Sequence, residues 1–230
     1  RRRVAILCPN NTWLIERDGH KIMLSVSASS ILRCVKDDET RYAFGLRMPV
    51  TQKRDVVWEW RGDVDVYSHK ARGTTSTAAL QVDHVIECQL AEVAMARAMR
   101  AHNVTRIGMV AGQASEVLRG ASNDVFNLNV TTMRINQAKK GPFVSAINRL
   151  KIDGHSLRRV SLKQMARMGR ARWMVDSGDW DRVETAIEKS FDCVRDALVI
   201  NTVDVLPGVE TIVDSTADEL HAILEHLDIF

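Results

Sequence analysis

The spacing of apolar residues changes character near residue 80. Before that point, short apolar runs alternate with polar turns, which predicts β-strands. The expected strands cover 4–7, 13–16, 21–24, 41–47 and 56–60, with a hairpin turn at 17–20. After that point, apolar residues recur every three or four positions, which is typical of amphipathic helices. The pattern therefore predicts a β-rich N-terminal region, residues 1–78, followed by an α+β region, residues 79–230.

The second region is expected to mix helices with a few strands. The predicted helices cover 88–100, 113–119, 144–150, 161–168, 183–198 and 214–227. The predicted strands cover 104–110, 125–133 and 199–205, and Gly141-Pro142 is expected to separate two elements. The last helix has a capping-box spacing, with Ser215 or Thr216 as the N-cap and Glu219 following. The predicted fold class is α+β, with a helical C-terminal part.

An aspartate and a histidine stand next to each other where the apolar run Val82–Ile86 begins. The carboxylate of Asp83 is a hard oxygen ligand of the kind that Mg²⁺ or Mn²⁺ prefers. The imidazole of His84 has an ordinary pKa near neutrality, about 6.5, so it can act as a general base. Successive strand residues point to opposite faces, so a strand must end or bend here if both side chains serve one site.

Three further polar residues follow in a fixed order. Asn127 precedes Leu128, Asn136 follows nine positions after Asn127, and Lys139 comes three positions later. An amide oxygen of Asn136 could complete the metal site, and Lys139 could contact a phosphate, with Lys140 a weaker candidate. Asn127 is expected to hydrogen-bond the backbone near His84 and so to orient its imidazole.

The order of these residues resembles the signature of HNH nucleases, the ββα-metal family. The resemblance implies two strands and a helix, with residues 85–126 inserted between the strands as a helix and a strand. It also implies that one divalent ion, Mg²⁺ or Mn²⁺, is held by Asp83 and Asn136. His84 and Asn127 are then the catalytic residues of a phosphodiester hydrolase, and a His84→Ala variant is expected to lose cleavage but not affinity.

Other residues compete for these roles. Asn123 and Asn129 lie near Asn127, but neither keeps the step of nine positions to Asn136. His155 is an alternative ligand to Asn136. Glu87 is either an extra ligand or the cap of the helix that follows it.

Composition limits the possible functions without choosing among them. The 230 residues carry a net charge of +3 and are 45% hydrophobic, which is ordinary for a globular protein. No run of 18 apolar residues is present, and the four cysteines show no C-x-x-C spacing, so a membrane span and a structural zinc site are not expected. The chain does not begin with methionine, so it is expected to be part of a longer protein.

Positive charge is concentrated after the motif. From Arg149 to Arg172 the chain carries eight Lys or Arg residues and a single acidic residue, Asp153. Phosphate contacts of such a tract give affinity without sequence specificity. The expected nucleic-acid contacts are Lys139, Lys140, Arg158, Arg159, Lys163 and Arg170.

In its general character the chain also resembles the C-terminal effector domains of the Crinkler class from oomycetes and chytrid fungi. That resemblance implies secretion, entry into a host nucleus and damage to DNA there. The leading hypothesis is a metal-dependent DNA endonuclease with little sequence preference, and RNA remains open as a substrate. The alternative hypothesis is an effector that binds DNA or protein on a decayed nuclease scaffold without turnover.

Overall fold

Two separate units make up the chain, residues 1–43 and residues 44–230. The computed structural model describes residues 4–8, 12–17, 20–25, 44–74, 79–105, 108–152, 161–202 and 205–230. In the first unit, strands β1 (Val4–Cys8), β2 (Thr12–Arg17) and β3 (His20–Ser25) form an antiparallel sheet in the order β1-β2-β3. The second unit holds all the candidate site residues.

The second unit is mostly helical with one small sheet. A 3-10 turn, η1 (Thr51–Lys53), leads into α2 (Arg54–Trp60), and β4 (Leu80–His84) is followed by α3 (Cys88–Ala101) and α4 (Met109–Ser122). A second 3-10 turn, η3 (Val125–Asn127), precedes β5 (Leu128–Thr132), which runs directly into α5 (Met133–Ile152). The remaining helices are α6 (Leu162–Met168), α7 (Arg172–Asp176), α8 (Asp179–Ile200) and α9 (Val209–His226).

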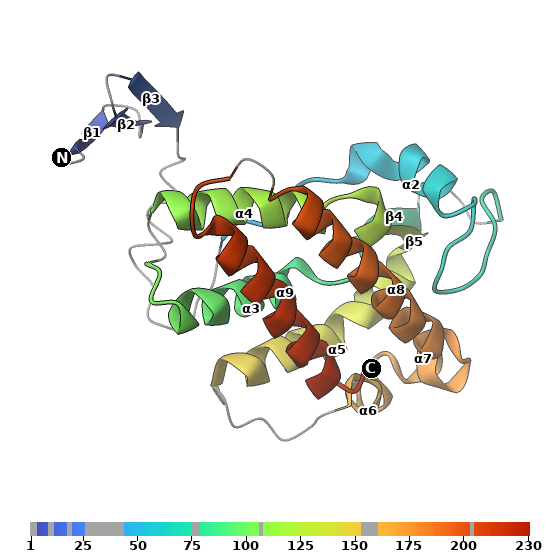
Figure 1. The fold of residues 1–230 in the computed structure, drawn as a ribbon. Coiled ribbons are helices and arrows are strands. Elements are labelled where there is room, and N and C mark those ends of the chain that lie inside the picture. The colour runs from blue at the N-terminus through green and yellow to red at the C-terminus, as the bar shows by residue number, and fades with distance from the viewer. Residues whose placement is uncertain are drawn as a thin grey trace. The chain divides into compact units, whose positions relative to one another are not determined.

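Helix α3 is the centre of the helical part. Ten of its residues are buried, because α9 packs along it and α4 and α5 contact it on other sides (Figure 1). Helix α8 packs on α4 and α9 through Val183, Ile187, Phe191, Val194 and Leu198, which are all buried and recur at helical spacing. The predicted helical period of this segment is therefore confirmed.

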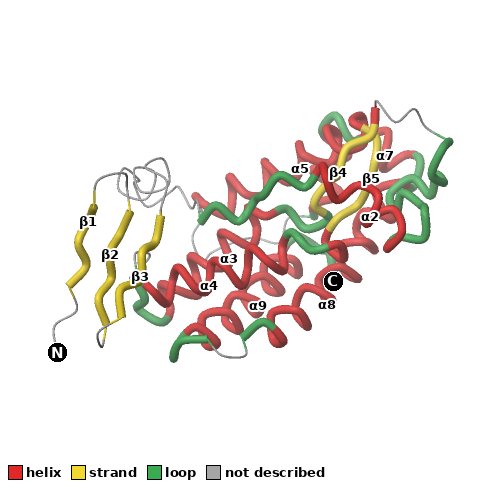
Figure 2. The backbone as a smooth tube through the Cα atoms, turned by 90° about the horizontal axis from the view of Figure 1, so that it is seen from above, coloured by secondary structure: helices red, strands yellow, loops and turns green. Residues whose placement is uncertain are grey.

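The sheet consists of β4 and β5, which pair in antiparallel fashion although α3 and α4 lie between them in sequence. Helix α2 lies beside the pair (Figure 2). Its Val57 and Trp58 join an apolar cluster with Val50 of the preceding segment, Leu80 of β4 and Leu128 and Val130 of β5. This cluster covers one face of the sheet.

The described residues are a mixture of helices and strands, as the class α+β requires, but they are mostly helical, the prediction of a β-rich region over residues 1–78 is not supported, and several predicted strands are wrong. Residues 56–60 belong to α2, because Val57 and Trp58 pack inward while Val56 and Trp60 stay exposed, which is a helical pattern. The described part of 41–47 has no regular structure. The predicted strand 104–110 runs into the start of α4, and the predicted strand 199–205 begins within α8.

The predicted break at Gly141-Pro142 is also wrong, since both residues lie inside α5. A proline within a helix removes one hydrogen bond and costs about 3 kcal/mol. A continuous buried face that includes Ala138, Phe143 and Ile147 runs past the proline and offsets this cost. The last helix likewise begins earlier than predicted, at Val209, directly after Gly208.

In the described part of the chain, none of the helices has the length and apolar character that crossing a membrane requires.

Two long helices each start immediately after a glycine with positive φ. Gly178 precedes α8 with φ of 76°, and Gly208 precedes α9 with φ of 89°. A backbone with positive φ is less favourable by about 1–2 kcal/mol for residues other than glycine, because their Cβ lies too close to the following carbonyl oxygen.

We therefore expect Gly178→Ala to lower the free energy of unfolding by about 1 kcal/mol or slightly more. The matched control is Gly141→Ala in the middle of α5, where an added Cβ meets no atom within 4 Å. That change should raise the free energy of unfolding by about 0.5–1 kcal/mol, because alanine is the better helix former. Urea denaturation measures both changes, and shifts of the same sign would contradict the backbone argument.

Candidate functional site

The pairing of β4 with β5 gives the small sheet one polar and one apolar face. Asp83 lies opposite Asn129, and Gln81 lies opposite Thr131, so these four side chains share a face. The other face carries the apolar residues of the strands, including Leu80, Val82, Leu128 and Val130, together with His84. The two motif residues Asp83 and His84 therefore point to opposite sides of the sheet.

Asp83 is completely buried on the polar face. Its Oδ2 accepts a hydrogen bond from the Tyr67 hydroxyl at 2.9 Å and one from Lys139 Nζ at 2.7 Å. Its Oδ1 is buried without a hydrogen-bond partner. One carboxylate oxygen is thus held firmly, while the other has its acceptor capacity unused.

Lys139 is also completely buried, on the face of α5 that packs against β4. Its ammonium group donates to Asp83 Oδ2, to the backbone carbonyl of His84 and to Glu87 Oε1, the last at 3.3 Å. An ammonium has three N–H donors, so all of them are used. Lys139 therefore fills a cage of three oxygen atoms, two of them from carboxylates.

The pKa values of these groups reflect burial opposed by pairing. Burial raises the pKa of Asp83, and the charge of Lys139 counteracts that increase. Burial alone would lower the pKa of Lys139, but Asp83 and Glu87 outweigh it, so the pKa lies above its ordinary value. Burial and the neighbouring Asp83 raise the pKa of Tyr67 well above its ordinary value. Tyr67 and Lys139 therefore remain protonated donors at neutral pH.

His84 belongs to a different network. Its Nε2 lies 2.9 Å from Asn123 Oδ1, and its Nδ1 is buried without a partner. The amide nitrogen of Asn123 donates to the carbonyls of Leu46 and Arg119, which identifies Oδ1 as the acceptor and Nε2 as the protonated ring nitrogen. Burial lowers the pKa of His84. The structure therefore does not bring this imidazole to the polar face where Asp83 lies.

Asn127 clamps the backbone between β4 and α3. Its Oδ1 accepts from the amide of Ile86 at 2.8 Å, and its Nδ2 donates to the carbonyls of Ile86 and Ser122. The predicted bond to backbone near His84 is thus found two residues further along. It fixes the turn from which Glu87 reaches Lys139.

Asn136 is half-buried on α5, one turn before Lys139. Its Nδ2 donates to Gln81 Oε1 at 2.9 Å, and Gln81 shares the polar face with Asp83. The structure therefore brings Asp83, Asn136 and Lys139 to one face of the sheet. Within the described ranges, no group of three or more His, Cys, Asp or Glu side chains is arranged to hold a metal ion.

The side chains predicted to contact nucleic acid differ in their exposure and in their ion pairs. Lys140 and Arg170 are exposed, whereas Lys163 forms an ion pair with Asp181 at 2.5 Å. Arg158 and Arg159, like the alternative ligand His155, lie outside the described residues.

Two further residues contact the polar face from residues 62–77, whose polar, Gly-, Ser- and Thr-rich sequence is typical of a solvated loop and so gives little sign of them. Tyr67 is buried against Asp83, and Asp65 is buried beside Asn129 and Thr131. The available signal was the alternation of Val64 and Val66 with these two residues inside an otherwise polar stretch.

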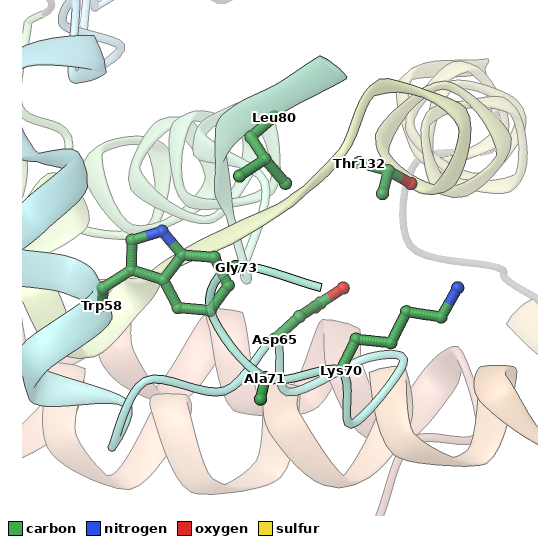
Figure 3. Close-up of a pocket in the computed structure, with 7 residues that line it drawn as sticks. All are labelled: Trp58, Asp65, Lys70, Ala71, Gly73, Leu80 and Thr132. Carbon is green, nitrogen blue, oxygen red and sulfur yellow. The ribbon is translucent and has the colours of Figure 1, made fainter. Parts of the chain in front are cut away.

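A small cavity lies between α2, this loop and the edge of the sheet (Figure 3). It is lined by Trp58, Asp65, Lys70, Ala71, Gly73, Leu80 and Thr132. The carboxylate of Asp65 already accepts four hydrogen bonds, so it has little capacity left to bind a ligand in the cavity.

No protein family, curated protein or solved structure was found to match this chain.

The buried ion pair leads to a stability prediction. Lys139→Met should lower the free energy of unfolding by about 3–5 kcal/mol at neutral pH, because it leaves the carboxylate of Asp83 buried and unpaired. Lys140→Met is the matched control, since its side chain is exposed, and it should change stability by less than about 0.5 kcal/mol.

The loss in free energy of unfolding caused by Lys139→Met should become smaller as the pH falls. Removing Lys139 raises the folded-state pKa of Asp83 further, and a carboxyl with a raised pKa favours the folded state more strongly at low pH. Urea denaturation from pH 7 to about pH 4 measures this change. A deficit that stayed constant would mean that Asp83 is not the group left unpaired.

Proposed function

We propose that this chain hydrolyses phosphodiester bonds in nucleic acid with the help of a divalent metal ion. The observation that carries the proposal is that β4, β5 and α5 come together despite the long insertion, residues 85–126, and place Asp83, Asn136 and Lys139 on one face. This is the strand-strand-helix arrangement that the sequence resemblance implies. On the Crinkler resemblance, the substrate is DNA of a host nucleus.

The oxygen atoms on this face suit a hard cation. Asp83 Oδ1 is buried without a partner, so a cation there would satisfy it without displacing Lys139 or Tyr67 from Oδ2. Asn136 uses its amide nitrogen toward Gln81, which leaves its carbonyl oxygen as the second ligand. Mg²⁺ commonly takes only one or two protein oxygens and keeps several waters.

Each side chain then has a distinct role. A bound Mg²⁺ or Mn²⁺ supplies a water of lowered pKa and a Lewis acid for the phosphate. Lys139 orients Asp83 through Oδ2 and offsets its buried charge. Asn127 holds the turn after β4 in place. His84, on the opposite face, supports the end of α4 through Asn123 and is not needed as the base.

Plasmid nicking tests this proposal. The wild-type protein should nick DNA with Mg²⁺ or Mn²⁺ but not with EDTA, and Asp83→Asn should lose this activity, because an amide is a much weaker metal ligand. Asp214→Asn, at an exposed position of α9, is the matched control and should cut normally. A parallel assay on single-stranded RNA decides between the two substrates.

His84→Ala separates the predicted catalytic role from the structural one. A structural role predicts lower stability but a cleavage rate within a few-fold of wild type at a temperature where the variant is folded. Complete loss of cleavage by a folded variant would restore His84 as the general base.

A second candidate function is nucleic-acid binding without turnover. It is favoured by the complete burial of Asp83 and Lys139, since a group that touches substrate must be accessible, and by the charge of α5. Helix α5 contains no acidic residue, and its exposed residues Arg134 and Arg149 lie on one side of the helix, while the exposed Lys140 lies about 180° from Arg149. From Arg134 to Arg149 the helix rises about 22 Å, the length of roughly six base pairs.

This second candidate predicts a specific salt dependence. Replacing Lys140 and Arg149 together by Ala should make the plot of log affinity against log salt shallower by about 1.8 if each contacts a duplex phosphate. Lys163→Ala is the control, because Lys163 is paired with Asp181 and should change the slope little. An unchanged slope in the double variant would exclude both Lys140 and Arg149 as phosphate contacts.

A further inference from the structure

A loop covers the polar face of the sheet together with α5. Residues 62–73 lie between α2 and β4 and begin and end with glycines of positive φ, 67° at Gly62 and 88° at Gly73. An added Cβ at either glycine would meet no atom within 4 Å, so the backbone conformation alone requires glycine there. Within the loop, Val64 and Ala71 form an isolated antiparallel bridge. The loop is therefore a self-paired unit with a flexible residue type at each end.

The first attachment of the loop to the sheet is Asp65. Its carboxylate accepts from Asn129 Nδ2 at 2.8 Å and from Thr131 Oγ1 at 2.9 Å, both on β5. It also accepts from the Ser68 hydroxyl and from the Tyr67 amide, so it organises the loop as well. In addition, Asn129 Oδ1 accepts a hydrogen bond from the backbone amide of Val66 at 3.2 Å.

The second attachment is Tyr67, whose hydroxyl donates to Asp83. Asp65 and Tyr67 are the buried side chains among the loop residues, while His69, Lys70 and Arg72 are exposed. The loop is thus held down by hydrogen bonds of polar groups, by an exposed ion pair of Arg72 with Asp55 of α2 at 2.5 Å and by the buried ring of Tyr67, rather than by a cluster of aliphatic side chains. Local opening is easiest for segments of this kind.

We propose that residues 62–73 are a lid that gates access to Asp83, latched by Asp65 and Tyr67 and hinged at Gly62 and Gly73. The structure has the lid closed. Opening withdraws Tyr67 from Asp83 Oδ2 and exposes Asp83, together with Lys139 beside it, to a divalent cation and a phosphate. This inference rests on the proposed hydrolytic function, since it describes how that same site is controlled.

Hydrogen exchange of the full chain tests the lid directly. In Tyr67→Phe and Asp65→Asn, peptides covering residues 64–70 should exchange at least tenfold faster than in the wild type. Asp63→Asn is the matched control: it is the same substitution two residues from Asp65, on an exposed carboxylate of the same loop, and it should leave exchange unchanged. Metal-dependent nicking by Tyr67→Phe should be several-fold faster than by the wild type.

The outcomes separate the lid from the hydrolytic function. Faster exchange in 64–70 with no nicking by any variant would keep the lid and overturn the proposed function. Metal-dependent nicking with unchanged exchange in both latch variants would keep the function and overturn the lid. Equal acceleration in α3 would also overturn the lid, because the loop would then open only when the whole unit unfolds.

Discussion

The ammonium group of Lys139 is the constraint on which the site depends. It joins α5 to the end of β4 through Asp83 and His84, and to the turn before α3 through Glu87. Burying three charged groups is costly, and good geometry with complete hydrogen bonding is the condition under which such a cluster is tolerated. Helix α5 cannot slide or rotate on the sheet without leaving a buried carboxylate unpaired, so the cluster fixes the register of the helix.

The continuous strand β4 also limits which side chains can act together at the site. A strand that continues through His84 must send Asp83 and His84 to opposite faces, and the pairing of His84 with Leu128 shows that the strand does continue. A carboxylate without its neighbouring imidazole can still hold a metal ion, which activates water by itself. The proposed hydrolysis therefore depends on Asp83 and a cation more than on His84.

The sequence was most informative where local pattern and long-range packing agree. The existence of β5 and of helix α3 follows from apolar runs and helical period, although the predicted strand 125–133 begins three residues too early, in η3. Residues 56–60 could not be read in this way, because Val56, Trp58 and Trp60 alternate like a strand and only packing of Val57 and Trp58 on the sheet selects a helix. Tyr67 was missed because its partner, Asp83, is distant in sequence.

The placement of α9 has a consequence for biosynthesis. Helix α3 leaves the ribosome before α9, the helix that packs along it, because α4 to α8 lie between the two in sequence. Until α9 has been made, the side of α3 that packs against α9 stays exposed. Contacts between segments that are distant in sequence also form slowly. Native packing of α3 therefore has to wait until α9 has been made, and the apolar side of α3 is open to aggregation in the interval.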